Sequence, residues 1–209
     1  MLKLDHLTII APSLDEGINH VHTCLGIEPG NEAVHTNMGT HNRRLRLGDD
    51  LYLEIVAIDP DAPAPGRPRW LALDFQKQLQ KDWEARKRLK SWVARTEDIG
   101  QAISGYESLL GAKTWLENAF HFSVLPDGSL PLDGALPCVI DRGGNPPPST
   151  RFEDQGFRLQ DFVLDHPEPT KIIRHFNTLK ISGHPTVRES PDFRLSALIK
   201  TPDGIKTLT

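Results

Sequence analysis

The sequence has little cysteine, and this scarcity excludes several architectures at once. Cys24 and Cys138 are the only two cysteines in 209 residues, and they lie far apart in apolar surroundings. We therefore expect two buried free thiols rather than a disulfide. No CxxC pair, GxSxG motif, P-loop or dinucleotide-binding fingerprint is present. Their absence argues against redox-disulfide, serine-hydrolase and nucleotide chemistry.

The chain also lacks a concentrated basic run. Its net charge is −4, and the cluster Arg86, Lys87, Arg88 and Lys90 is short and follows acidic residues. We interpret this cluster as a solvated face. No nucleic-acid partner is expected for a chain with this charge distribution.

Long apolar runs are absent as well. No segment stays apolar for long enough to cross a membrane, so we expect no membrane partner. The N-terminus MLKLDHLTII leads straight into a strand pattern and has no signal-peptide cleavage site. These two observations predict a cytoplasmic protein.

What the chain does contain is typical of a soluble globular protein. Hydrophobic residues make up 38% and charged residues 25%, and the length suits one large domain or two small ones. Its most informative stretch is 39–60, GTHNRRLRLGDDLYLEIVAIDP, which predicts two strands joined by a tight turn. Arg43–Leu47 is the first strand, 48–50 the turn and Leu51–Ile58 the second.

Two ionisable residues lie on strands that are otherwise apolar. Glu54 is the one charged position of the second hairpin strand, and His6 lies on the N-terminal strand Leu2–Ala11. A carboxylate in a buried strand is costly unless it is paired, protonated or bound to a metal. If the two strands are neighbours, the imidazole and the carboxylate meet on one concave face.

A strand–helix–strand pattern occurs three times in the chain. In the first repeat, Ser13 and Glu16 form a capping-box pattern, and a helical stripe runs from Ile18 to Leu25 before Gly26. We divide the chain into a first βαβββ module (1–60), a linker and helix (61–88), a second module (89–145) and a third module (146–209).

The later repeats follow the same order. In the second, a strand at 92–95 precedes a helical stripe at 99–110 and strands at 113–117, 120–125 and 136–140. In the third, a strand at 159–164 precedes a helix and strands at 186–189, 195–200 and 205–208. Between modules, 59–69 is expected to be irregular before a helix within 73–89, and 143–149, with three prolines, to be extended.

Several segments together resemble the vicinal oxygen chelate superfamily, in its glyoxalase-like branch. These segments are LDHLTIIAPSLDEG, GTHNRRLRLGDDLYLEIVAIDP, RWLALD, SWVARTEDI and PDGSLPLDGALPCVI. The superfamily includes glyoxalase I, extradiol dioxygenases, epimerases and antibiotic-resistance binding proteins. The resemblance implies an α+β fold in which repeated βαβββ modules form curved mixed sheets around a cup.

The resemblance also implies a metal site. In the superfamily a divalent metal is held by one His or Gln and one Glu from each of two modules, and His6 and Glu54 match the pair of the first module. The second pair is incomplete. The strand at 91–95 has no His, and His121 lies one strand before Asp141. We keep His121 as a candidate third ligand.

The third module departs from the pattern too, because its first strand offers Gln160 while the position of the late Glu falls near Thr207. Two interpretations of the His6–Glu54 pair therefore stay open. In one, the pair and solvent or substrate oxygens hold Zn, Mn, Fe or Ni, and the metal acts as a Lewis acid. In the other, no cofactor is bound, and the pair is a buried hydrogen bond. Glu54 is also a candidate catalytic base.

Three further residues are candidates for binding substrate. His41 and Asn42 follow Gly39 and precede the strand that begins at Arg43, and small polar residues on a loop at the mouth of a cup can hold a ligand. Local turn hydrogen bonds by Thr40 and Asn42 are the alternative. Arg44 alternates with leucine and suits an anionic substrate, or a solvated edge. We assign no chemistry to the remaining histidines, His35 among them.

Two functions follow from the sequence. The first is a glyoxalase-like, metal-dependent enzyme of the lyase, isomerase or dioxygenase class, acting on a small oxygenated substrate. The second is a metal-free protein of the binding or resistance type, which holds a small-molecule ligand in the same cup. The resemblance leaves a homodimer open, because in this superfamily two chains can combine to complete each cup.

Overall fold

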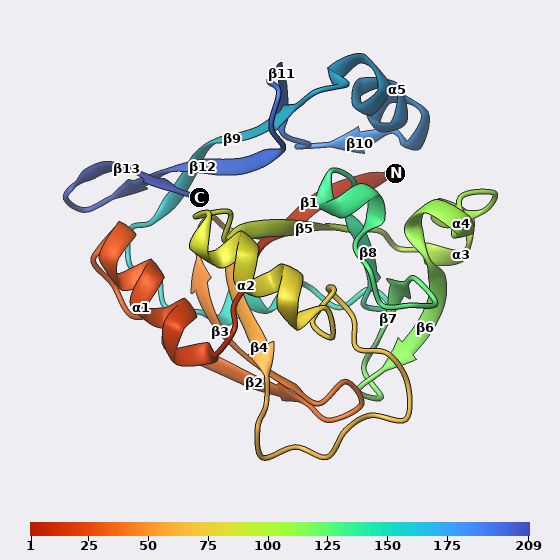
Figure 1. The fold of residues 1–209 in the computed structure, drawn as a ribbon, viewed down its shortest axis with the longest axis horizontal. Coiled ribbons are helices and arrows are strands. Elements are labelled where there is room, and N and C mark those ends of the chain that lie inside the picture. Colours follow the sequence, from red (N-terminus) through yellow and green to blue (C-terminus); the bar gives the residue numbers. More distant parts are fainter.

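The computed structural model describes residues 1–209 and contains two β-sheets (Figure 1). The first module has the expected strand–helix–three-strand order: β1 (Leu2–Ile10), α1 (Leu14–Leu25), β2 (Asn31–His35), β3 (Thr40–Arg46) and β4 (Tyr52–Ile58). A long connection with the short helix α2 (Gln76–Glu84) leads from it to the second module.

The second module repeats this order with shorter helices. Its elements are β5 (Leu89–Arg95), α3 (Ile99–Ile103), α4 (Glu107–Leu110), β6 (Ala112–Leu116), β7 (Phe120–Val124), the 3-10 turn η1 (Pro131–Gly134) and β8 (Cys138–Asp141). The single helix expected at 99–110 is therefore two helices. The break falls at Gly105, whose φ of +78° lies in the left-handed region that favours glycine.

The remaining chain leads into the 3-10 turn η2 (Pro148–Arg151). Of the segment expected to be extended, 143–149, the turn takes the last two residues, and Pro147 before it is extended with φ −57° and ψ 146°. The elements that follow are β9 (Arg158–His166), α5 (Pro169–Leu179), β10 (Ile181–Ser182), β11 (Thr186–Glu189), β12 (Arg194–Thr201) and β13 (Gly204–Leu208).

The first two modules share one curved sheet. Its order is β2-β3-β4-β1-β5-β8-β7-β6, and β10 pairs with β1 off this path. Within each module the last strand lies parallel beside the first, and the modules join where β1 runs antiparallel to β5. The second module, rather than the third, therefore completes the cup with the first. The fold is α+β with curved mixed sheets, as predicted.

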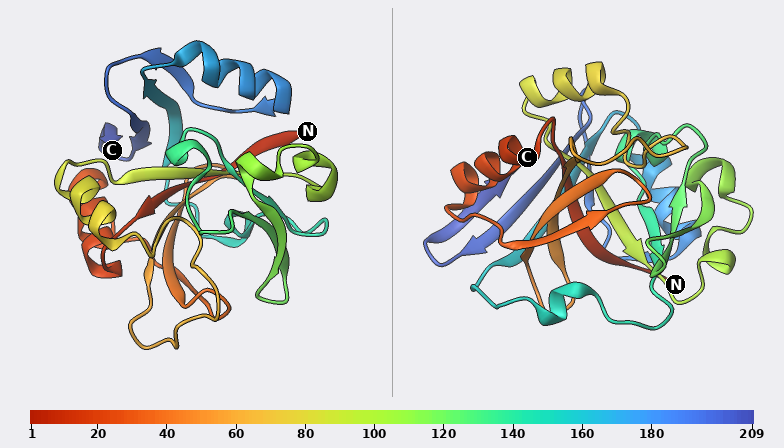
Figure 2. Two further views of the ribbon diagram at one scale, coloured as in Figure 1. Left: turned by 45° about the vertical axis from the view of Figure 1, so that its right-hand side comes forward. Right: turned by 90° about the horizontal axis from the view of Figure 1, so that it is seen from below.

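The third segment forms a separate four-stranded sheet with the order β11-β9-β12-β13. Its first strand, β9, pairs with two strands of its own segment, whereas β1 and β5 each pair with only one strand of their own module. Figure 2 shows this sheet and α5 on one side of the curved sheet.

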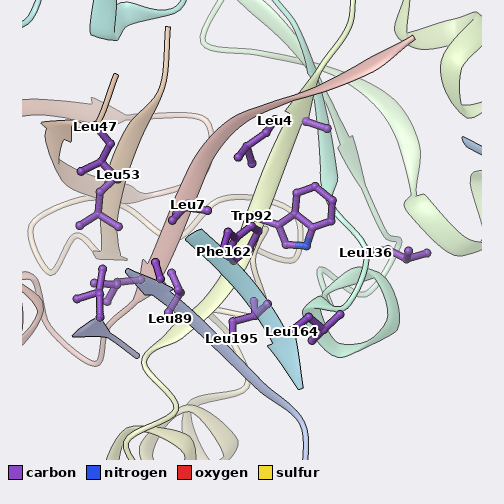
Figure 3. Packing of buried hydrophobic residues seen from close by; sticks show 14 of the residues in the cluster. Leu4, Leu7, Leu47, Leu53, Leu89, Trp92, Leu136, Phe162, Leu164 and Leu195 are labelled. Carbon is purple, nitrogen blue, oxygen red and sulfur yellow. The ribbon is translucent and has the colours of Figure 1, made fainter. Parts of the chain in front are cut away.

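The larger hydrophobic core lies between these two sheets and α1. The Trp92 ring of β5 packs edge-on against the Phe162 ring of β9, with centroids 5.8 Å apart (Figure 3). It packs in the same way against Phe176 of α5, at 5.7 Å. Helix α1 begins as its sequence predicts, because the Ser13 hydroxyl accepts the Glu16 N–H, and it ends at Gly26 in the left-handed conformation.

A second core fills much of the cup itself. The connection between the modules supplies Trp70, Leu71, Leu73 and Leu79, which pack on apolar side chains of the concave face. The stretch expected to be irregular thus leads into the segment that packs the cup's interior. Both cysteines are free thiols, as expected, but only Cys138 is buried, and Cys24 is half-buried. No helix has both the length and the apolar character needed to span a membrane.

Candidate functional site

The two ionisable strand residues meet inside the cup. Because β1 and β4 are parallel neighbours, His6 and Glu54 project from the same concave face, and His6 Nε2 lies 3.2 Å from Glu54 Oε2. Both residues are buried, at 3% and 8% exposure. The juxtaposition expected from the apolar strand patterns is therefore present.

A second carboxylate holds the other side of the imidazole. His6 Nδ1 donates a hydrogen bond to Asp5 Oδ1 at 2.6 Å, and the ring stacks on Tyr52 at 4.4 Å. Burial alone would lower the pKa of His6, but the hydrogen bonds to Asp5 and Glu54 outweigh it, and the pKa is raised above 6.5. The cavity therefore contains an imidazole that is cationic over a wider pH range than usual.

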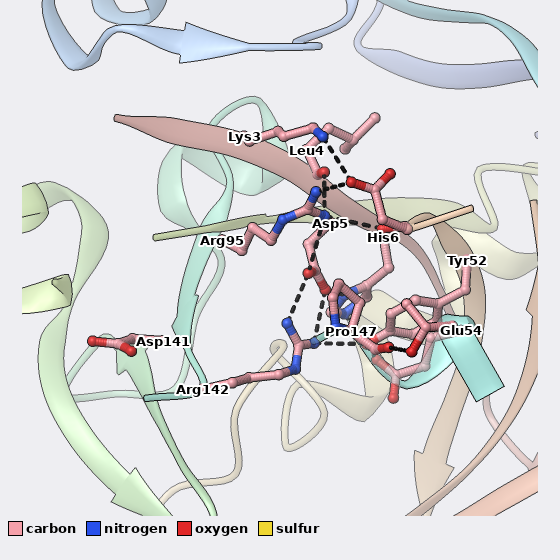
Figure 4. Close-up of polar contacts among 12 residues, drawn as sticks. Lys3, Leu4, Asp5, His6, Tyr52, Glu54, Arg95, Asp141, Arg142 and Pro147 are labelled. Carbon is pink, nitrogen blue, oxygen red and sulfur yellow. Dashed lines mark hydrogen bonds and ion pairs between the residues drawn. The ribbon is translucent and has the colours of Figure 1, made fainter. Parts of the chain in front are cut away.

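Asp5 is fully buried and depends on Arg142 of the second module. The guanidinium donates two hydrogen bonds to its carboxylate, at 2.7 and 2.8 Å, and a third to the Tyr52 hydroxyl at 3.1 Å (Figure 4). Burial opposes ionisation of Asp5, but His6 and Arg142 lower its pKa far below 3.8. A charge network therefore crosses from one module to the other.

The second oxygen of Glu54 is also occupied. The Asn42 amide donates to Glu54 Oε1, and His35 Nε2 lies 3.8 Å from the same oxygen. Burial would raise the pKa of Glu54, but the neighbouring imidazoles of His35 and His6 hold it well below 4.5. Glu54 is therefore an ionised group with partners on both oxygens.

A cavity of about 330 Å³ lies beside this network and is lined by His6, Glu54 and Arg142 among others. One wall is aromatic and contains Trp70, Phe120 and Phe122. The charged residues that line the cavity are His6, Arg44, Arg142 and Arg151 on the positive side, and Glu54 and Glu117 on the negative side. With His6 protonated, cationic groups outnumber carboxylates by two, which favours an anionic ligand.

Glu117 has a structural task at the mouth of the cup. Its carboxylate accepts the backbone N–H groups of Thr36 and Asn37 at 3.0 and 2.7 Å, and Asn37 Oδ1 accepts the Glu117 N–H at 2.6 Å. The tips of the β2–β3 and β6–β7 hairpins are thus fastened to each other. Both oxygens of this carboxylate are therefore occupied by backbone donors.

The other candidates from the sequence divide into two groups. Asn42 and Arg44 line the cavity beside Glu54. His41 belongs to the opposite face of β3 and is absent from the lining, and its Nε2 is buried without a partner. His121 likewise points away from the cavity, and its ring packs on Trp115 at 4.7 Å. The structure does not bring His41 or His121 to the His6–Glu54 pair.

The donor set does not match the four-ligand metal centre of the superfamily. No group of three or more His, Cys, Asp or Glu residues is arranged to hold a metal ion. His6 and Glu54 supply two ligand atoms, and both oxygens of Glu54 already have protein partners. Metal binding therefore stays a prediction from the resemblance.

Several residues of the site were not predicted. Asp5 should face away from the cup by strand alternation, but a register shift between Leu4 and His6 in the β1–β5 pairing lets it reach the network. Arg142 directly follows β8, the last strand of the second module. A charged residue at the end of a strand that borders the cup is a sequence signal that could have identified it. His35 lies on the edge strand β2, whose sequence has no apolar alternation that would indicate which residues face the cup.

A family model described as a glyoxalase-like domain matches residues 4–179. The chain belongs to the glyoxalase-like domain family. This membership agrees with the resemblance that the strand motifs indicated. No curated protein sequence matches this glyoxalase-like chain.

Solved structures that are similar to this chain are distant from it in sequence. A hypothetical protein from Staphylococcus aureus is 11% identical, with a TM-score of 0.59, over 93% of this chain and 88% of that one. A methylmalonyl-CoA epimerase from Streptomyces coelicolor is 14% identical, with a TM-score of 0.44, over 71% and 100% of the two chains. The Mycobacterium tuberculosis epimerase is 16% identical, with a TM-score of 0.40, over 66% and 84%.

Proposed function

We propose that this glyoxalase-like protein binds a small anionic molecule with oxygen functions in the cup cavity. The observation that carries the proposal is the composition of the lining, in which three arginines and a raised-pKa histidine face two carboxylates beside an aromatic wall. Such a cavity suits a carboxylate or enolate at the charged end and a flat or apolar group against the rings.

Arg151 is the group best placed to bind the anion. Arg142 is committed to Asp5, and Arg44 donates to the backbone carbonyl of Glu32 and lies over the Phe152 ring. Arg151 lines the cavity from η2 and forms no ion pair or side-chain hydrogen bond. Its guanidinium is therefore free to hold a carboxylate in a two-point contact.

Calorimetry with a panel of small carboxylates and 2-oxo acids tests this proposal, with wild type compared to Arg151→Gln. We expect the variant to bind about tenfold or more weakly, because a charge-assisted hydrogen bond contributes about 1.5–3 kcal/mol. Arg174→Gln is the matched control, since Arg174 is exposed on α5, outside the cavity lining. No binding by wild type, or equal losses in both variants, would contradict the proposal.

A metal-dependent lyase, isomerase or dioxygenase is the second candidate function. It is favoured by one arrangement: Asp5 holds His6 Nδ1 and thereby turns Nε2 towards the Glu54 carboxylate. A carboxylate bonded to the far nitrogen of a metal-binding histidine orients the ring in the same way. Elemental mass spectrometry of wild type, His6→Ala and Glu54→Ala tests it. About one metal per chain, lost in both variants, would support the enzyme. No uptake of Mn, Fe, Ni or Zn by wild type would remove this candidate.

A further inference from the structure

A second cavity lies beside the first, at the end of the cup near α2. Its volume is about 430 Å³. Buried apolar side chains form much of its wall, namely Ile10, Leu71, Leu79 and Leu130, while Lys87 and the Asp82–Lys90 ion pair add charge to the lining. Nothing in the proposed function of the first cavity uses this space.

One residue belongs to the lining of both cavities. Leu71 is 3% exposed and is the only side chain that the two linings share. It lies in the connection that packs inside the cup, between Trp70 of the first cavity and Ala72 of the second. Leu71 is therefore the residue at which the two cavities adjoin, and we call it the divider.

The backbone at this divider has an unfavourable conformation. Leu71 and Ala72 have φ values of +57° and +56°, in the left-handed region that costs a residue with a side chain about 1 kcal/mol or more. The Ala72 N–H is held by the Gly128 carbonyl at 2.8 Å. A Cβ at Gly128 would lie 2.0 Å from the Arg69 carbonyl oxygen, so this loop requires glycine to support the divider.

The strand behind the divider links the two cavities. His6 lines the first cavity, Ile10 lines the second, and Thr8 lies between them on the same face of β1. The Thr8 hydroxyl and the hydroxyl of Ser91, opposite it on β5, are buried without hydrogen-bond partners. Pairing with β4 is unbroken from His6 to Ile10, so this face of β1 runs continuously from one cavity to the other.

We propose that the two cavities are the two ends of one binding channel and that Leu71 limits how far a ligand extends along it. The ligand class is an unbranched carboxylate. Its charged end lies at the arginine-lined cavity, which rests on the proposed function, and its apolar chain points towards Ile10 and Leu130. Leu71 is then a specificity-determining residue, because its side chain sets the chain length that the cup accepts.

Two ligand series test the channel: unbranched monocarboxylates from acetate to decanoate, and primary alcohols of the same lengths. Binding is measured by calorimetry for wild type, Leu71→Ala and Leu71→Phe. Leu73→Ala is the matched control, because Leu73 is buried in the same segment but lines neither cavity. Thermal unfolding of each variant shows that the folded protein is being compared.

In wild type we expect affinity to stop rising at a short chain length. In Leu71→Ala it should continue to rise, by about fourfold for each added methylene, as expected for burial of one CH₂ group. Leu71→Phe should stop at a shorter chain than wild type, and Leu73→Ala should keep the wild-type profile.

Superimposable carboxylate profiles in wild type and both Leu71 variants would overturn the channel and leave the proposed function standing. A change in Leu73→Ala as large as that in Leu71→Ala would also overturn it. If only the alcohols bind, with the Leu71 dependence described, the divider is supported and the anion-binding function is lost. If neither series binds to any variant, both are overturned.

Discussion

Arg142 holds both carboxylate oxygens of Asp5, at 2.7 and 2.8 Å, although the two residues are 137 positions apart. Asp5 belongs to the first strand of the first module, and Arg142 follows the last strand of the second. The ion pair therefore fixes the two halves of the cup against each other directly below the His6–Glu54 pair. Because Asp5 also accepts a hydrogen bond from His6, the ion pair connects the stability of the fold to the protonation of His6.

Removing this carboxylate should be costly. In Asp5→Asn, Arg142 and His6 both lose a buried anionic partner, so we expect the free energy of unfolding to fall by about 3–5 kcal/mol in urea titrations. Asp165→Asn is the control, because its partner Arg188 is exposed and such pairs contribute about 0–1 kcal/mol. Equal decreases in the free energy of unfolding in the two variants would show that the buried Asp5 pair stabilises the fold no more than an exposed pair.

The raised pKa of His6 predicts a pH dependence with a definite sign. Because the folded pKa lies above the unfolded value of about 6.5, the stabilisation is complete below that pH and is lost as the pH rises through the folded pKa. Chemical denaturation across pH 6 to 9 should show wild type losing stability relative to His6→Gln. A stability difference that stays constant with pH would mean that His6 titrates normally.

Glu54 should control the titration of His6. In Glu54→Gln the imidazolium keeps Asp5 but loses its second anionic partner, so the pKa of His6 should fall relative to wild type. NMR titration of the imidazole C–H signals measures it. Glu117→Gln is the matched control, a carboxylate of the same cavity that bonds backbone N–H groups instead. The assignment of Glu54 as the partner fails if only the control shifts the titration.

Close packing of α1 on the sheet should make Gly17 intolerant of a side chain. A Cβ at Gly17 would lie 2.3 Å from Ile55 Cγ2, whereas a Cβ at Gly30 would meet nothing within 4 Å. Gly17→Ala should therefore lower the free energy of unfolding by about 1–3 kcal/mol, and Gly30→Ala should change it by about 0.5 kcal/mol or less. Thermal unfolding of both variants decides the point.

The sequence predicts the part of the site that depends on strand alternation. Glu54 and His6 interrupt apolar strands on one face, and a single period-2 pattern was enough to bring them together. The same pattern separates His41 from Asn42, because neighbours along a strand point to opposite faces. A loop interpretation of His41 missed this, since β3 already begins at Thr40.

Other parts could not be read from a pattern. Asp5 enters the network through a register shift, which depends on how β5 pairs with β1. The packing of Trp70 and Leu71 inside the cup has no periodicity to reveal it, because the segment is neither helix nor strand. Strand order in the third segment also depends on pairing partners, and βαβββ order along the chain does not determine them.

The position of β1 has a consequence for how this protein folds. The first strand pairs with β4, β5 and β10, so its neighbours are separated from it by about 50, 90 and 180 residues of sequence. Contacts this remote along the chain close slowly, because long loops must be ordered before they form. During synthesis β1 would emerge well before these partners, and its apolar faces would be exposed to aggregation until they arrive.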